Sequence, residues 1–149
     1  MLSMITLLSL LSFIRSFFNR HFIILSGKQK ILLVDDSALI CKRLNTILSE
    51  LPFVEVLGEA MNGDEAIEKI TLLMPDIVLL DINIPGTSGF NILIWLRASY
   101  KQMKVIMLSN HAQQEYRDMA FSLGADYFLD KASEFDQLPA LIADINNQF

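Results

Sequence analysis

The sequence predicts an α/β fold, a doubly wound, five-stranded parallel sheet with helices on both faces. From Lys30 onward, five short apolar runs alternate with five segments whose apolar residues recur at helical spacing. Short loops join these segments, and right-handed crossovers then place helices on both sides of the sheet. The chain has 149 residues, of which 52% are hydrophobic, enough for one well-packed domain.

The strands are expected in the five apolar runs. "KILLVD" and "DIVLLD" are almost wholly apolar, which is typical of strands that are buried on both faces. "VEVLGEA" has a more mixed, alternating character, which favours a position nearer the edge of the sheet. The five predicted strands are residues 30–35, 54–60, 76–81, 104–109 and 127–130.

The helices are expected between these strands, with recognisable start and stop signals. Ser37 can cap the first helix of the domain, which Pro52 ends, and Pro75 stops the second. Ser133 and Asp136 are expected to form a short capped turn. The remaining helices are predicted from Asn62 or Gly63 through Met74, over 90–100, over 112–123, and from Pro139 to about Gln148.

A hydrophobic extension precedes the domain, so we divide the chain into residues 1–27 and 28–149. Residues 1–26 contain 16 apolar positions and no acidic residue. The uncharged stretch ends before Arg15 and is too short for a spanning helix, which needs about 20 residues. The extension can be a membrane-surface or signal-anchor helix, a flexible neutral segment, or translation from a non-native start. We favour the last two interpretations over membrane contact.

Charge and cysteine content limit the possible partners and compartment. The net charge is −5, and the chain beyond residue 27 carries 10 basic and 17 acidic residues. No basic stripe is present to follow a phosphate backbone, so we expect no direct binding to nucleic acid. The single cysteine, Cys41, excludes an internal disulfide and suits a reducing compartment such as the cytoplasm.

Polar residues stand at the carboxyl ends of four of the predicted strands, where ligands bind in open α/β sheets. Three nearby carboxylates require protons or a cation, and oxygen ligands without a His or Cys cluster suit Mg²⁺. A carboxylate can also be the nucleophile of a phosphoryl transfer. The residues at this edge are Asp35, Asp36, Asp81, Ser109 and Lys131.

Residues 30–148 resemble the receiver domain of two-component response regulators. The resemblance lies in four motifs, "VDDS" (34–37), "LLDINIPGTSGF" (79–90), "MLSNHA" (107–112) and "GADYFLDKA" (124–132). It implies a flavodoxin-like sheet of strand order 2-1-3-4-5. It also implies a cytoplasmic protein that accepts a phosphoryl group from the phosphohistidine of a sensor histidine kinase or histidine phosphotransfer protein.

The resemblance also implies a role for each residue of the site. Asp81 would be the phosphoacceptor, and Ser109 and Lys131 would assist the transfer. Ser109 and Phe128 would be the two switch residues. The Mg²⁺ ligands would be Asp35, Asp36, Asp81 and the backbone carbonyl of Asn83. The chain departs from the family at Asn110 and His111, which leaves the lifetime of the phosphoryl group open.

Three functions are weighed against one another. The favoured one is a single-domain response regulator that signals through an unidentified protein partner or relays the phosphoryl group, since no residues follow Phe149. A phosphohydrolase using an aspartyl phosphate is disfavoured by Asn83, where such enzymes place a second acid, and by the chain length. The main alternative is a receiver-like docking module that works without phosphorylation.

Overall fold

The computed structural model describes residues 3–111 and 113–148, and the side chains of these residues except 16–26. Its centre is the parallel five-stranded sheet that the sequence predicts, in the order β2-β1-β3-β4-β5 that the family resemblance implies. The strand with mixed character, β2, lies at one edge. The strands are β1 (Gln29–Val34), β2 (Val54–Ala60), β3 (Ile77–Asp81), β4 (Lys104–Ser109) and β5 (Tyr127–Asp130).

The helices begin and end close to the predicted positions. The Ser37 side chain accepts a hydrogen bond from the Ile40 amide, and the Asn62 side chain accepts one from the Glu65 amide. The helices are α1 (Met4–Ser26), α2 (Ala38–Ser49), α3 (Gly63–Leu73), α4 (Gly89–Ser99), α5 (Gln114–Ser122), the short 3₁₀ helix η1 (Phe135–Gln137) and α6 (Leu138–Asn146).

The expected capped turn at Ser133 and Asp136 is wrong in its detail. The segment is helix η1, which starts without a side-chain cap. The Ser133 hydroxyl instead donates to Oδ2 of Asp130, and the Ala132 amide donates to Oδ1 of the same carboxylate. The side chain of Asp130 therefore orders the turn from the strand that precedes it.

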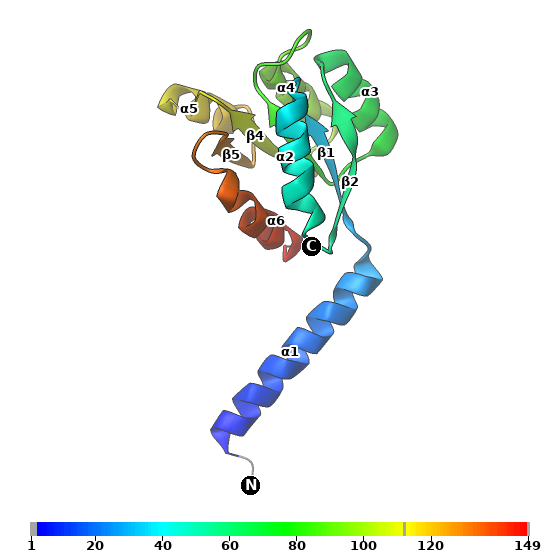
Figure 1. Ribbon diagram of the computed structural model, residues 1–149, viewed down its shortest axis with the longest axis vertical. Coiled ribbons are helices and arrows are strands. Elements are labelled where there is room, and N and C mark those ends of the chain that lie inside the picture. The colour runs from blue at the N-terminus through cyan, green and yellow to red at the C-terminus, as the bar shows by residue number, and fades with distance from the viewer. Residues whose placement is uncertain (1–2, 112, 149) are drawn as a thin grey trace.

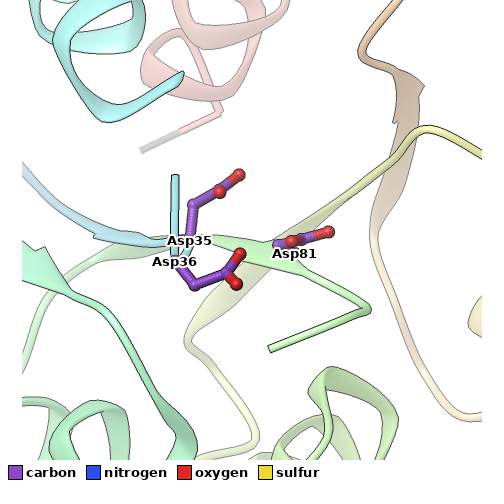
Figure 2. Close-up of side chains that lie close together, drawn as sticks. All are labelled: Asp35, Asp36 and Asp81. Atoms are coloured by element: carbon purple, nitrogen blue, oxygen red, sulfur yellow. The ribbon is translucent and has the colours of Figure 1, made fainter. Parts of the chain in front are cut away.

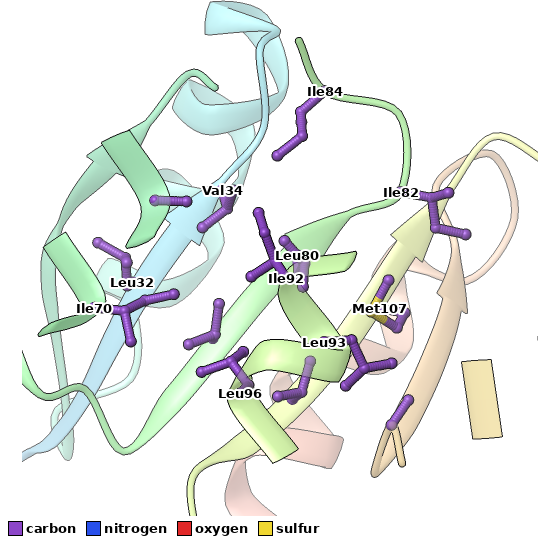
Figure 3. Close-up of a cluster of buried hydrophobic side chains, with 14 of the residues drawn as sticks. Leu32, Val34, Ile70, Leu80, Ile82, Ile84, Ile92, Leu93, Leu96 and Met107 are labelled. Atoms are coloured by element: carbon purple, nitrogen blue, oxygen red, sulfur yellow. The ribbon is translucent and has the colours of Figure 1, made fainter. Parts of the chain in front are cut away.

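Two hydrophobic layers cover the two faces of the sheet. Helices α3, α4 and α5 pack on one face, where Leu80 and Ile92 belong to a continuous buried cluster (Figure 3). Helices α2 and α6 cover the opposite face, with Leu44 and Ile142 among the fully buried side chains. Full burial of one such side chain contributes about 1.5–3 kcal/mol to stability. The sheet is thereby held rigid beneath the carboxyl ends of its strands.

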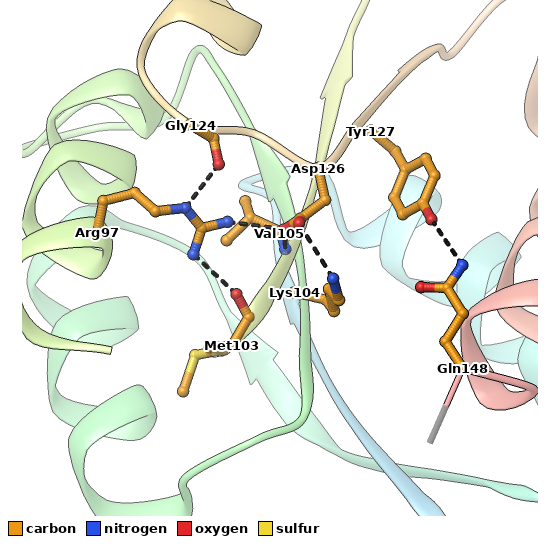
Figure 4. A network of polar contacts seen from close by, with 8 residues as sticks. All are labelled: Arg97, Met103, Lys104, Val105, Gly124, Asp126, Tyr127 and Gln148. Carbon is orange, nitrogen blue, oxygen red and sulfur yellow. Dashed lines mark hydrogen bonds and ion pairs between the residues drawn. The ribbon is translucent and has the colours of Figure 1, made fainter. Parts of the chain in front are cut away.

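An arginine fastens helix α4 to the opposite, amino-terminal edge of the sheet. Arg97 donates from Nε to the Gly124 carbonyl at 2.6 Å and from Nη1 to the Met103 carbonyl at 2.8 Å (Figure 4). Its Nη2 pairs with Oδ2 of Asp126 at 2.7 Å. This network supplies hydrogen-bond donors to loop carbonyls at the end of the sheet opposite the polar residues that follow the strands. We therefore assign it a structural role.

Helix α1 extends away from the rest of the molecule and covers no face of the sheet (Figure 1). The described side chains of residues 3–15 are all exposed, including Phe13 at 69%. Within the described part of the chain, none of the helices combines the length and the hydropathy that crossing a bilayer requires. Among the residues of α1 whose side chains are described, 4–15, none belongs to either hydrophobic cluster of the domain.

Candidate functional site

Strand β1 delivers two adjacent carboxylates with opposite exposure. The Asp35 amide continues the β1–β2 ladder by donating to the Ala60 carbonyl at 3.0 Å, which turns its side chain inward to 1% exposure. Its Oδ1 accepts the Ser37 amide at 2.9 Å. Asp36, the next residue, is exposed. One carboxylate is thus fixed by the fold, and the other remains accessible from solvent.

Strand β3 ends at Asp81, whose backbone is closely approached by helix α4. A Cβ at position 89 would lie 2.2 Å from the Asp81 carbonyl oxygen, so only glycine fits there. The Gly89 amide donates to the Ile82 carbonyl at 2.9 Å, which closes the loop after the carboxylate. The Asn83 amide donates to Oδ1 of Asp81 at 3.4 Å and so lies beside it. The Asp81 side chain is 7% exposed.

Lysine 131 brings the two buried carboxylates together from the other end of the chain. Its Nζ lies 2.5 Å from Oδ2 of Asp35 and 3.2 Å from Oδ2 of Asp81. Ligand oxygens of Asp35, Asp36 and Asp81 all lie within 4.8 Å of one another, where β1 and β3 end (Figure 2). The structure thus brings together four of the five side chains that the sequence places at this edge of the sheet.

The charges at this site are unevenly compensated. Burial raises the pKa of Asp81 above its ordinary value of 3.8, and the neighbouring charge of Asp35 also raises it. The ammonium of Lys131 opposes both effects. Three carboxylates and one ammonium leave two formal negative charges, which matches a divalent cation. Oxygen-only ligands without a His or Cys neighbour are of the kind that Mg²⁺ prefers.

Ser109 and Phe128 occupy adjacent strands beside the carboxylates. Ser109 ends β4, is fully buried, and its Oγ accepts the His111 amide at 2.9 Å. Phe128 lies in β5, opposite Met107 of β4, and is 5% exposed. The Lys131 amide donates to the Ser109 carbonyl at 2.9 Å, so the ends of the two strands are hydrogen-bonded together.

Two sets of side-chain contacts near the site were not predicted from the sequence. The His111 ring stacks on Tyr116 with centroids 5.7 Å apart, and Tyr116 stacks on Phe90 at 6.3 Å. Arg117 and Glu134 form an ion pair beside Phe128. No short motif signals these contacts, because they depend on how α5 packs against α4 and against the turn after β5.

Comparison with known proteins agrees with this geometry. The family model described as "Response regulator receiver domain" matches residues 31–143. A protein-glutamate methylesterase/protein-glutamine glutaminase of Trichodesmium erythraeum is 36% identical over 123 residues, which are 81% of this chain and 35% of that protein. The nitrate/nitrite response regulator protein NarL of Escherichia coli is 35% identical over 108 residues, 72% of this chain and 50% of that protein. The matched part of this chain therefore spans about a third to a half of the length of these two curated relatives.

Solved structures show the same relationship for separate receiver domains. The response regulator domain of Thermotoga maritima CheB has a TM-score of 0.71 and 30% identity, covering 80% of this chain and 95% of that one. The signal receiver domain of the putative regulator NarL from Mycobacterium tuberculosis has a TM-score of 0.73, 30% identity, and coverage of 80% and 96%. With its sheet order and its cluster of carboxylates, the chain belongs to the response regulator receiver domain family of two-component signalling.

Proposed function

We propose that Asp81 is the phosphoacceptor of this receiver and that the phosphoryl donor is a phosphohistidine on a sensor histidine kinase or histidine phosphotransfer protein. The observation that carries the proposal is the convergence of Lys131 on both Asp35 and Asp81, at 2.5 and 3.2 Å. A buried carboxylate with a cation beside it is positioned to meet a phosphoryl group and to have the added charge neutralised.

The transfer requires little of the protein beyond positioning. An oxygen of the Asp81 carboxylate bonds to phosphorus as the phosphorus–nitrogen bond of the donor breaks. The electron pair leaves with the imidazole nitrogen, which takes up a proton from solvent. Lys131 stabilises the charge on the phosphoryl oxygens, and the Ser109 hydroxyl supplies a hydrogen bond to one of them.

We assign the metal site to Asp35, Asp36 and Asp81, together with the backbone carbonyl of Asn83. When bound, Mg²⁺ supplies positive charge at the transferred phosphoryl group. The exposed Asp36 offers an oxygen that no described protein group engages by hydrogen bond or ion pair, whereas Asp35 is already held by Lys131 and the Ser37 amide. We therefore expect Asp36 to contribute the more direct carboxylate contact and Asp35 a contact through water.

The output of the receiver is proposed to be a change in protein binding, in the cytoplasm, with no second substrate to be turned over. Phosphorylation of Asp81 would draw the Ser109 hydroxyl toward the new oxygens and would further favour the inward position of Phe128, next to the space that is vacated. The surface formed by α5, β5 and α6 would then change its affinity for a downstream protein.

Intact mass spectrometry tests the proposal directly. The full chain, incubated with acetyl phosphate and Mg²⁺, should gain the mass of one phosphoryl group, and chelation of Mg²⁺ should abolish the gain. Asp81→Asn should remain unmodified, while Asp144→Asn, a matched change at an exposed position of α6, should be modified like the wild type. An unmodified wild-type chain would instead support the docking module that works without phosphorylation.

A further inference from the structure

Arg117 of helix α5 contacts strand β5 and the turn that follows it. Its Nη1 donates to the Phe128 carbonyl at 3.3 Å, and its Nη2 pairs with Oε2 of Glu134 at 2.6 Å. The guanidinium carbon also lies 4.8 Å from the centre of the Phe128 ring, within the range of a cation–π contact. One side chain therefore holds both the backbone and the ring of Phe128.

Glu134 extends these contacts to the turn that carries Lys131. The same Oε2 that receives Arg117 also accepts the Asp130 amide at 2.7 Å, and the Glu134 amide donates to the Asp130 carbonyl at 2.9 Å. Asp130 pairs with Ser109 across β4 and β5 and directly precedes Lys131. The Arg117–Glu134 pair thus fixes helix α5 to the segment whose next residue is the lysine of the site.

The contacts with Arg117 and Glu134 oppose outward rotation of the Phe128 ring. The ring is 5% exposed, and the guanidinium lies over it. Outward rotation would break the cation–π contact and return apolar area to water. The side chains of Arg117 and Glu134 are each 24% exposed, so solvent screens their ion pair less than it screens a fully exposed one.

We propose that Arg117 is a positioning residue of the switch, which holds Phe128 in its inward position and couples helix α5 to the turn of Lys131. The inference rests on the proposed phosphorylation of Asp81. If a phosphoryl group favours the inward state of Ser109 and Phe128, then contacts that favour this state must favour phosphoryl-like ligands in equal measure. Arg117 would therefore raise the affinity of the site before any phosphorylation occurs.

The reversible probe is beryllofluoride, an analogue of the phosphoryl group, added with Mg²⁺ to the full chain. Arg117→Met keeps an apolar side chain and removes the guanidinium group. It should weaken beryllofluoride binding about three- to tenfold, because a smaller fraction of the protein then has Phe128 in its inward position. Arg117→Lys keeps the charge without the planar geometry and should recover part of the affinity. Lys69→Met, which removes the partly exposed Lys69–Glu65 ion pair of α3, is the matched control and should bind like the wild type.

A second readout does not depend on the ligand. NMR of ¹³C-phenylalanine protein, with the Phe128 signal assigned by Phe128→Leu, should show a mobile ring in unligated Arg117→Met. Hydrogen exchange at the Asp130 amide should accelerate in the same variant. If Arg117→Met does not fold, Glu134→Gln replaces it, because the amide oxygen still accepts the Asp130 amide while the charge that holds Arg117 is removed.

The outcomes separate this inference from the proposed function. If wild-type protein does not bind beryllofluoride, the assignment of Asp81 fails, and the ring mobility and amide exchange still decide the role of Arg117. An unchanged affinity with an immobile Phe128 ring in Arg117→Met would overturn the inference. So would a loss of affinity that Lys69→Met reproduces, since that would reflect stability alone.

Discussion

Lys131 and Asp35 are 96 residues apart in the sequence and form an ion pair of 2.5 Å whose side chains are 4% and 1% exposed. The same ammonium lies 3.2 Å from Asp81. A buried charge is tolerated only when it is paired, so Asp35 and Lys131 require each other. The site is therefore also a structural element of the domain, and changes within it should affect stability as well as phosphorylation.

Removal of Lys131 should leave Asp35 buried without its partner. We expect Lys131→Ala to lower the free energy of unfolding by about 3 kcal/mol, measured by urea denaturation. Adding Asp35→Asn to this variant should restore part of the loss, because the uncompensated charge is then gone. Lys131→Ala should still accept some phosphoryl group, but Phe128 should no longer respond in NMR spectra. An equally stable Lys131→Ala protein would contradict the importance of this ion pair.

Neutralising Asp81 should stabilise the metal-free protein. Because burial raises the pKa of Asp81, the folded state binds more protons than the unfolded state between the ordinary value of 3.8 and the raised one. Stability therefore falls as pH rises through that window. We expect Asp81→Asn to be more stable than the wild type at pH 7 by on the order of 1 kcal/mol, with a smaller difference at acid pH. Thermal unfolding across pH measures this, with Asp144→Asn as the control. A less stable Asp81→Asn at pH 7 would show that its ion pair with Lys131 outweighs desolvation.

Magnesium should stabilise the folded state through the three carboxylates. At about ten times its dissociation constant, the ion should add about 1.4 kcal/mol to the free energy of unfolding. Asp36→Ala should abolish this response, yet the metal-free variant should be as stable as the wild type or more so, because like-charge repulsion is relieved. Glu68→Ala, a change at an exposed position of α3, should keep the response. Unchanged Mg²⁺ binding in Asp36→Ala would refute the assignment of that ligand.

Helix α1 should be dispensable for the fold and for phosphorylation. None of its described side chains belongs to either core cluster. We expect a chain that starts at Gly27 to unfold cooperatively and to accept a phosphoryl group from acetyl phosphate at the rate of the full chain. Fractionation of cells that express the full chain tests membrane contact separately. Firm association with the membrane fraction at high salt would show that the extension binds a bilayer.

The sequence by itself determined how strands and helices alternate along the chain and which residue types stand at the site. Continuous apolar runs such as 30–34 have no polar face, so they are stable only when buried on both sides of a sheet. Once the strands are parallel, their carboxyl ends share one edge, which places Asp35, Asp81 and Lys131 together. The strands and their ends could be predicted because apolar periodicity and strand boundaries depend on residues that are neighbours in the sequence.

Only the tertiary structure decided which of these groups are paired. It shows that Lys131 approaches Asp35 more closely than Asp81, at 2.5 against 3.2 Å. It also brings Arg117 to Phe128 and Glu134, an ion pair between residues that are 17 positions apart and belong to no common motif. The direction of a long charged side chain depends on the packing of the helix that carries it and on the nearest unpaired partner. Both depend on contacts between distant segments, which no local pattern in the sequence encodes.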